Sequence, residues 1–217
     1  MSVQARTRVK ICGLTRLEDI QTAAQAGADA IGLVLYAKSA RAVSLQQARL
    51  LRAAVPVFVN AVTLFVNAPE REVREAIEQL RPELLQFHGD ESPQYCESFN
   101  HRYMRAFRVG APGLDTPEGV LQACRRYQSA SAWLFDSYSD SYGGSGRRLD
   151  PSLLRLVQEA GDSRPLVLAG GLQPDTVAAA IRTTRPYAVD VSSGVEAAPG
   201  DKCPQKIRQF LAAVRGL

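Results

Sequence analysis

The stretch Val9-Lys10-Ile11-Cys12-Gly13-Leu14 predicts a short apolar strand that runs out into a glycine turn. Successive side chains of a strand point to opposite faces, so Lys10 and Cys12 share one face and Val9 and Ile11 the other. In a parallel α/β barrel the first pair points inward, and the strand ends carry the chemistry. Cys12 is therefore a candidate functional thiol, although an isolated cysteine in an apolar strand is usually an inert small hydrophobe.

The composition predicts one globular domain spanning residues 1–217. The chain is 46% hydrophobic and 22% charged, and 217 residues suffice to bury a substantial core. The formal net charge of +4 is mild, and the basic pairs at 125–126 and 147–148 are not interleaved with aromatic residues as a nucleic-acid groove requires. We therefore expect a small anionic ligand as the partner and no nucleic acid.

The cysteines indicate a reducing compartment. Four are present, far apart and without a CxxC pair, and only two histidines accompany them, so no metal is expected: Cys12, Cys96, Cys124 and Cys203. The first eight residues lack the apolar core of a signal peptide, and no apolar run approaches the roughly 18 residues that span a bilayer. We expect a cytoplasmic protein with no membrane partner, either a monomer or a homodimer.

Strand-like runs alternate with amphipathic helical stretches eight times along the chain. The predicted strands cover residues 9–12, 30–35, 61–66, 84–87, 104–109, 133–135, 166–168 and 188–191. Predicted helix starts are marked by the N-caps Thr15, Ser44 and Ser92 and by Pro69, Pro93, Pro117, Pro151, Pro174 and Pro204. This order predicts an α/β fold, a single-domain (β/α)8 TIM barrel. The alternative, a doubly wound open sheet, calls for a GxGxxG turn after the first strand, which the sequence lacks.

Polar residues follow the fourth and sixth predicted strands. His88 shares a strand face with Gln86, where a single histidine is most often a structural hydrogen-bonding group. Asp136 follows three large apolar residues, and a carboxyl beside an apolar core can serve as an acid, although aspartate there is also a common loop cap. The next loop, 137–149, contains Gly143-Gly144-Ser145-Gly146, which indicates either a lid that closes over substrate or a merely flexible surface loop.

Two loops of small residues follow the last two strands. Gly170-Gly171 comes after the seventh strand and Ser192-Ser193-Gly194 after the eighth. Barrels of this kind cradle a phosphate in these two loops, with backbone N–H groups that small residues leave accessible. The pair predicts a phosphorylated substrate. A basic loop after the second strand, with Lys38 and Arg41, suits a second anionic group such as a carboxylate.

Together these motifs resemble the phosphoribosylanthranilate isomerases of tryptophan biosynthesis, over nearly the whole chain. The resemblance is carried by residues 9–13, 38–41, 86–89, 136, 143–146, 170–172 and 190–196. That family has a (β/α)8 fold and converts N-(5-phosphoribosyl)anthranilate to 1-(2-carboxyphenylamino)-1-deoxyribulose 5-phosphate by an Amadori rearrangement. No cofactor is expected, because the substrate's own nitrogen serves as the electron sink once the sugar ring opens.

The resemblance also implies roles for individual residues. Cys12 would be the general base that removes the proton from sugar C2′, and Asp136 the general acid that protonates the ring oxygen. Arg41 would hold the anthranilate carboxylate, and the loops at 170–171 and 192–194 the phosphate. Further expected substrate contacts come from Lys10, His88, Gly144 and Asp190. Since a thiol is mostly protonated at neutral pH, we expect Lys10 to lower the pKa of Cys12.

Two other functions stay open at this point. A related histidine-pathway isomerase would use two aspartates and a substrate phosphorylated at both ends, and Cys12 argues against that reading. A barrel without catalysis would bind phosphate esters and be indifferent to changes at Cys12 and Asp136. One residue departs from the family pattern: Ala37 follows Tyr36 where a proline is common, which leaves the placement of Arg41 open.

Overall fold

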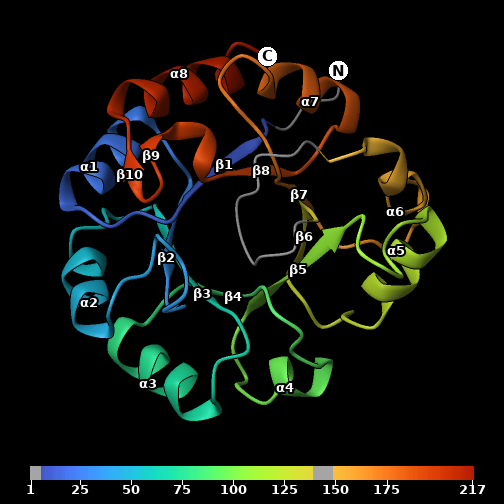
Figure 1. Ribbon diagram of the computed structural model, residues 1–217, viewed down its shortest axis with the longest axis horizontal. Helices are drawn as coiled ribbons and strands as arrows, with labels where there is room; N and C mark the ends of the chain where they lie inside the picture. The colour runs from blue at the N-terminus through green and yellow to red at the C-terminus, as the bar shows by residue number, and fades with distance from the viewer. Residues whose placement is uncertain (1–5, 139–148) are drawn as a thin grey trace.

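A ring of eight strands surrounded by helices makes up the fold (Figure 1). The computed structural model describes residues 6–138 and 149–217. The ring strands are β1 (Arg8–Cys12), β2 (Ala30–Val34), β3 (Asn60–Phe65), β4 (Leu84–Phe87), β5 (Tyr103–Val109), β6 (Ala132–Ser137), β7 (Leu166–Leu168) and β8 (Ala188–Val191). The α-helices are α1 (Leu17–Ala26), α2 (Leu45–Ala53), α3 (Glu70–Leu80), α4 (Pro93–Glu97), α5 (Pro117–Arg125), α6 (Arg155–Glu159), α7 (Val177–Thr184) and α8 (Pro204–Arg215).

The ring is a closed parallel barrel. Each strand pairs in parallel with its neighbours in chain order, and β1 pairs with both β2 and β8. An open doubly wound sheet would leave two edge strands, so that alternative is excluded. The predicted (β/α)8 barrel is confirmed.

Three strands, β4, β7 and β8, have the predicted bounds, four others differ by one residue at one or both ends, and the sixth strand departs most. It was expected over 133–135 but runs over Ala132–Ser137, because its pairing with β5 continues through Asp136 and Ser137. Asp136 therefore belongs to the ladder itself. Its backbone is fixed by the strand, which is a more rigid support than a loop.

Two of the three predicted N-caps are confirmed. Ser44 and Ser92 are the N-cap residues of α2 and α4. The hydroxyl of each accepts a hydrogen bond from the backbone N–H of the residue three positions later. Thr15 is wrong as a cap, because its hydroxyl instead donates to the carbonyl of Gly200 at 3.2 Å. The N-cap position of α1 falls to Arg16, whose side chain makes no capping bond.

Four of the six prolines stand at a helix start as predicted. They begin α4, α5, α8 and the 3-10 helix η1 (Pro151–Leu154). Pro69 is one position too early, at the N-cap of α3, and Pro174 lies in the turn that precedes α7. Both exceptions are compatible with proline, since neither position requires an N–H within the helix.

The two faces of the strands enter different apolar clusters, as strand alternation requires. Outward residues such as Val9 and Ile11 pack with the surrounding helices in the large core. Inward residues from β5 to β8, among them Leu134, form a second cluster inside the barrel. Cys12 belongs to a third, with Val34 and other residues near the barrel mouth. The predicted facing of the first strand is confirmed.

An element that the sequence did not predict follows β8. A 3-10 turn, η2 (Ser193–Val195), leads into a short antiparallel hairpin of β9 (Glu196–Ala198) and β10 (Asp201–Lys202). Arg16 holds this hairpin by pairing with Asp201 at 2.6 Å and donating to the Lys202 carbonyl at 2.7 Å. In Figure 1 the hairpin lies beside α1, on the β1 side of the barrel mouth.

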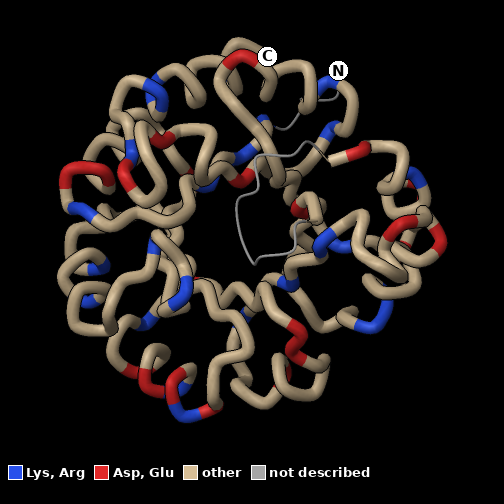
Figure 2. Tube along the Cα trace, viewed as in Figure 1, with Lys and Arg blue, Asp and Glu red and all other residues tan. Residues whose placement is uncertain are grey.

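Charged residues of both signs are distributed around the outer ring of helices. Figure 2 shows lysine and arginine interspersed with aspartate and glutamate along this periphery. Among the described residues, no helix combines the length and the apolar character that a membrane crossing requires.

The aromatic packing outside β4 gives a stability prediction. Phe87 is fully buried against Phe65, Phe99 and Tyr103, with ring centroids 5.8 to 6.2 Å away. Phe87→Ala is expected to lower the free energy of unfolding by about 3–5 kcal/mol, because it removes the ring and leaves a cavity. Urea denaturation followed by circular dichroism measures this loss. The matched control is Phe58→Ala, at a ring that is 95% exposed, and its change should stay within about 0.5 kcal/mol. Equal losses in both variants would contradict the packing described.

Candidate active site

A cavity opens at the C-terminal ends of the barrel strands. Its wall combines residues from β1, β2, β3, β4, β6 and β8 with the segments that follow β2, β3, β4, β7 and β8. Predicted site residues that line it are Cys12, Arg41, His88, Asp136, Gly170, Gly171, Asp190, Ser192, Ser193 and Gly194. The structure thus gathers around one hollow ten residues that are spread over more than 180 positions of sequence.

Cys12 lies near the floor of the cavity, with 5% of its surface exposed. The neighbouring strand carries Gly32 at this level, and a Cβ there would come within 2.8 Å of the thiol sulfur and 3.1 Å of the Lys10 Nζ. Glycine is therefore required on β2, because any side chain would displace the thiol or the ammonium. The absence of one side chain creates the space in which Lys10 and Cys12 sit.

Lys10 is placed below the thiol and not in the cavity wall. Its Nζ donates to Oδ1 of Asp190 at 2.8 Å, and both side chains are more than nine-tenths buried. Burial alone would lower the pKa of Lys10, but Asp190 and Cys12 outweigh it and raise that pKa, so the side chain stays cationic. Lys10 is not among the residues that line the cavity, whereas its partner Asp190 is.

The expected lowering of the Cys12 pKa is wrong for the free protein. Burial raises the pKa of this thiol, and the nearby charge of Asp190 raises it further. The ammonium of Lys10 acts in the predicted direction but does not overcome the burial. The sequence identified the correct neighbour, but it carried no measure of how deeply the thiol is buried or of the carboxylate that Lys10 faces.

Asp136 and His88 approach each other across the mouth. Oδ1 of Asp136 accepts the backbone N–H of Ser137 at 2.9 Å, and Oδ2 lies 3.5 Å from Nε2 of His88. Nδ1 of His88 faces the amide nitrogen of Gln86 at 3.1 Å, and an amide nitrogen can only donate. The other ring nitrogen, Nε2, is the one that faces Asp136. His88 is thus a close polar neighbour of the Asp136 carboxyl, and both residues line the cavity.

The loops after β7 and β8 fit closely against each other. Gly170 and Gly171 have φ of 79° and 65°, a region that favours glycine. A Cβ on Gly194 would lie 1.8 Å from the carbonyl oxygen of Leu172, so no side chain can be accommodated there. Close backbone approach of this kind exposes N–H groups to an anionic ligand, as the sequence pattern indicated.

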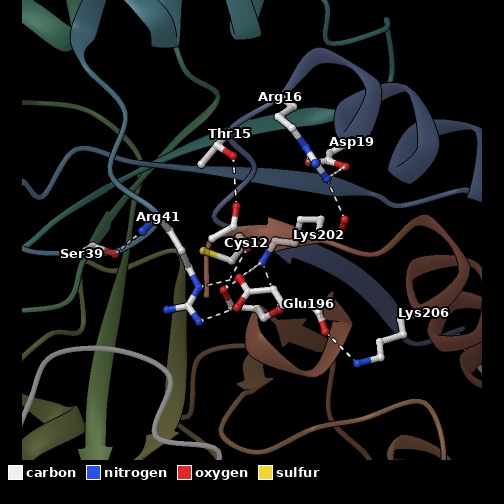
Figure 3. Close-up of polar contacts among 11 residues, drawn as sticks. Cys12, Thr15, Arg16, Asp19, Ser39, Arg41, Glu196, Lys202 and Lys206 are labelled. Atoms are coloured by element: carbon white, nitrogen blue, oxygen red, sulfur yellow. Dashed lines mark hydrogen bonds and ion pairs between the residues drawn. The ribbon is translucent and has the colours of Figure 1, made fainter. Parts of the chain in front are cut away.

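Arg41 is fixed on three sides despite the alanine at position 37. Its backbone N–H donates to Oγ of Ser39 at 3.1 Å, and its side-chain stem lies where a Cβ on Gly13 would be. Its guanidinium donates two hydrogen bonds to the carboxylate of Glu196, at 2.7 and 2.8 Å (Figure 3). The loop therefore obtains its rigidity from hydrogen bonds and packing instead of a proline.

Three results complete the comparison with the sequence. Gly144, and with it the glycine run of the predicted lid, lies outside the described residues. The described residues form no cluster of three or more histidine, cysteine, aspartate or glutamate side chains suited to a metal ion. Glu196, the last residue of the matching motif, and Lys202 were not predicted as members of the site; their contacts with Arg41 and Ser192 follow only from the fold.

The fold and the cavity define a (β/α)8 barrel enzyme with its reactive groups at the carboxyl ends of the strands. A family model described as N-(5'-phosphoribosyl)anthranilate (PRA) isomerase matches residues 9–213. The N-(5'-phosphoribosyl)anthranilate isomerase of Bordetella avium is 58% identical over 210 residues, covering 97% of this chain and 96% of the relative. The chain belongs to the N-(5'-phosphoribosyl)anthranilate isomerase family.

Solved structures agree with this assignment. Phosphoribosyl anthranilate isomerase from Thermotoga maritima superposes with a TM-score of 0.87 at 37% identity, covering 97% of this chain and 100% of that one. A phosphoribosyl anthranilate isomerase in complex with reduced 1-(o-carboxyphenylamino)-1-deoxyribulose 5-phosphate gives a TM-score of 0.84 at 35% identity, with the same coverage. Another structure describes monomers made from the dimeric Thermotoga maritima enzyme.

The burial of Cys12 predicts how its thiol titrates. Because burial raises its pKa, the thiolate fraction near neutral pH should be smaller than that of an ordinary cysteine, whose pKa is about 8.5. Alkylation by iodoacetamide, followed by peptide mass spectrometry in a Cys203→Ser background, should give a midpoint above that value. Lys10→Met should move the midpoint further up, since it removes the nearest cation. A midpoint below that of free cysteine, or no response to Lys10→Met, would contradict this description.

Proposed function

We propose that Cys12 and Asp136 are the base and the acid with which this chain carries out the reaction of its family. As a member of that family the chain is an isomerase of tryptophan biosynthesis. It converts N-(5-phosphoribosyl)anthranilate to 1-(2-carboxyphenylamino)-1-deoxyribulose 5-phosphate. The observation that carries the residue assignment is that a thiol on β1 and a carboxyl on β6 line one cavity together with the glycine loops and Arg41.

The first step is opening of the furanose ring. Asp136, in its protonated form, donates a proton to the ring oxygen as the bond from that oxygen to C1′ breaks, and the anthranilate nitrogen supplies the electron pair. The product is a cationic Schiff base at C1′. Nε2 of His88 lies 3.5 Å from Oδ2, and an N–H on this nitrogen would stabilise the carboxylate that Asp136 becomes.

The second step is proton removal from C2′. The thiolate of Cys12 takes this proton, the C–H electron pair forms the C1′–C2′ double bond, and the iminium nitrogen is neutralised. The resulting enolamine gains a proton at C1′ and loses the proton of its C2′ hydroxyl, which gives the ketone. A raised thiol pKa in the free protein is compatible with this order, because the cationic Schiff base forms beside the thiol and favours its ionised form.

The two ends of the substrate have separate supports. We assign the phosphate to the backbone of Gly170-Gly171 and of Ser192-Ser193-Gly194, where both loops face the cavity. We assign the carboxylate of the anthranilate to Arg41 in the loop after β2. The related structure that holds a reduced form of the product supports a small phosphorylated ligand as the partner. Four free thiols support the cytoplasm as the location.

The test is turnover of freshly generated substrate, followed by loss of its fluorescence. Cys12→Ser and Asp136→Asn should each lower kcat by about 10²–10⁴, the range for a general acid or base. Cys203→Ser and Asp162→Asn are the matched controls, because they change a half-buried thiol and an exposed carboxylate outside the cavity wall. Their kcat should stay within about twofold of the wild-type value.

Two outcomes would contradict the assignment. Substrate binding without turnover in the wild type would leave a barrel that only binds phosphate esters. Turnover that is unaffected by Cys12→Ser or Asp136→Asn would place the acid or the base elsewhere in the cavity.

A further inference from the structure

We propose that Glu196 and Lys202 are positioning residues that hold Arg41 and the Ser192 loop in one rigid unit, so that the carboxylate and phosphate ends of the substrate are bound together. The inference rests on the proposed function, in which Arg41 binds the carboxylate and the loop after β8 binds the phosphate. Glu196 ends the motif 190–196 that carried the resemblance but was given no role there, and the sequence did not single out Lys202. Both are nearly fully buried, with side chains 4% and 0% exposed.

Glu196 fixes the orientation of Arg41. One carboxylate oxygen accepts from Nε at 2.7 Å and the other from Nη2 at 2.8 Å, a two-pronged contact that allows the guanidinium little rotation. The guanidinium has five N–H donors, so this contact leaves those on Nη1 for another anion. Figure 3 shows the remaining nitrogen of Arg41 directed away from Glu196. Since Arg41 lines the cavity, a substrate carboxylate meets a cation that is already aimed.

Lys202 ties Glu196 to the loop after β8. Its ammonium has three donors and three acceptors around it: Oε1 of Glu196 at 2.6 Å, the carbonyl of Ser192 at 3.0 Å and the hydroxyl of Ser192 at 3.2 Å. The Ser192 hydroxyl in turn donates to the carbonyl of Cys12 at 3.0 Å. A continuous chain of polar contacts therefore runs from Arg41 through Glu196, Lys202 and Ser192 to the strand that carries the thiol.

The charges along this series of polar contacts suit an anionic ligand. Arg41 and Lys202 are cationic and Glu196 is anionic, which leaves one net positive charge. Burial would raise the pKa of Glu196, but hydrogen bonds and charge from Arg41 and Lys202 hold it below its ordinary value. Burial lowers the pKa of Lys202, and Glu196 opposes that shift.

A buried ion pair is a poor way to obtain stability, because desolvation of the two charges offsets most of their attraction. Apolar residues would hold the hairpin equally well at this depth. Apolar residues would not, however, orient a guanidinium or donate hydrogen bonds to the two oxygens of Ser192. The hairpin β9–β10 supports this reading, because Gly200 at its tip has φ of 82° and packs where a Cβ would lie 2.4 Å from the carbonyl of Ala40, next to Arg41.

The test separates orientation of Arg41 from general stability by comparing two ligands. One is reduced 1-(o-carboxyphenylamino)-1-deoxyribulose 5-phosphate, and the other is the same compound without its carboxylate. The ratio of their dissociation constants in wild-type protein measures the preference for the carboxylate. Glu196→Gln should lower that preference about tenfold or more, the size of one charge-assisted hydrogen bond. Arg41→Met should abolish it.

Glu91→Gln is the matched control. Glu91 is also buried, with 2% of its side chain exposed and an arginine partner, Arg105, at 2.8 Å, but it does not line the cavity. The variant Glu91→Gln removes a charge that is equally buried. Its ligand preference should equal that of the wild-type protein. Glu196→Asp keeps the charge but is too short to reach both partners, so it should lower the preference even if Glu196→Gln folds poorly.

Lys202→Met tests the other half of the unit. It should weaken binding of ribose 5-phosphate, a probe without anthranilate, about tenfold, because Ser192 loses its contacts. If wild-type protein turns over substrate and prefers the carboxylate, but Glu196→Gln behaves like Glu91→Gln, the inference is overturned and the proposed function stands. If wild-type protein shows no turnover, the proposed function itself fails.

Discussion

The pairing of β1 with β8 closes the barrel, and it sets Lys10 directly opposite Asp190 in the ladder. Their side chains form an ion pair of 2.8 Å inside the barrel. Two residues further along each strand, at the mouth, stand Cys12 and Ser192, and the serine hydroxyl bonds to the cysteine carbonyl. A slip of β8 by one residue would turn Asp190 and Ser192 toward the helices, away from Lys10 and Cys12. The closure of the barrel thus determines the contents of the site.

Burial has opposite consequences for the groups of the site. For Lys10, the lowering of the pKa by burial is outweighed by the carboxylate of Asp190 and by Cys12, so the buried ammonium stays charged. For Cys12 it dominates, and the thiol of the free protein resists ionisation. In the proposed mechanism, a thiol that stays neutral until the cationic Schiff base forms beside it is less reactive toward alkylation and oxidation between turnovers. The low dielectric constant at this depth also strengthens the electrostatic interaction of each nearby charge with the thiol.

Strand alternation and the order of small-residue loops were sufficient to predict the barrel and most of the cavity wall. They placed Cys12 inward and Gly170-Gly171 and Ser192-Ser193-Gly194 at one mouth, because both depend on local pattern and on the chain order of parallel units. The partnership of Lys10 with Asp190 spans 180 positions and follows only from closure of the ring. Lys202 lies in a two-residue strand that is too short to carry a periodic signal. Its contacts with Glu196 and Ser192 therefore could not be predicted from the sequence.

The most direct measurement is a kinetic isotope effect with substrate deuterated at C2′, in Cys12→Ser and in Asp136→Asn. The account predicts a primary isotope effect on single-turnover rates in Cys12→Ser, because removal of the C2′ proton then limits the reaction. It predicts none in Asp136→Asn, where ring opening is limiting and no C2′ bond breaks. An isotope effect in Asp136→Asn and none in Cys12→Ser would contradict the assignment of base and acid.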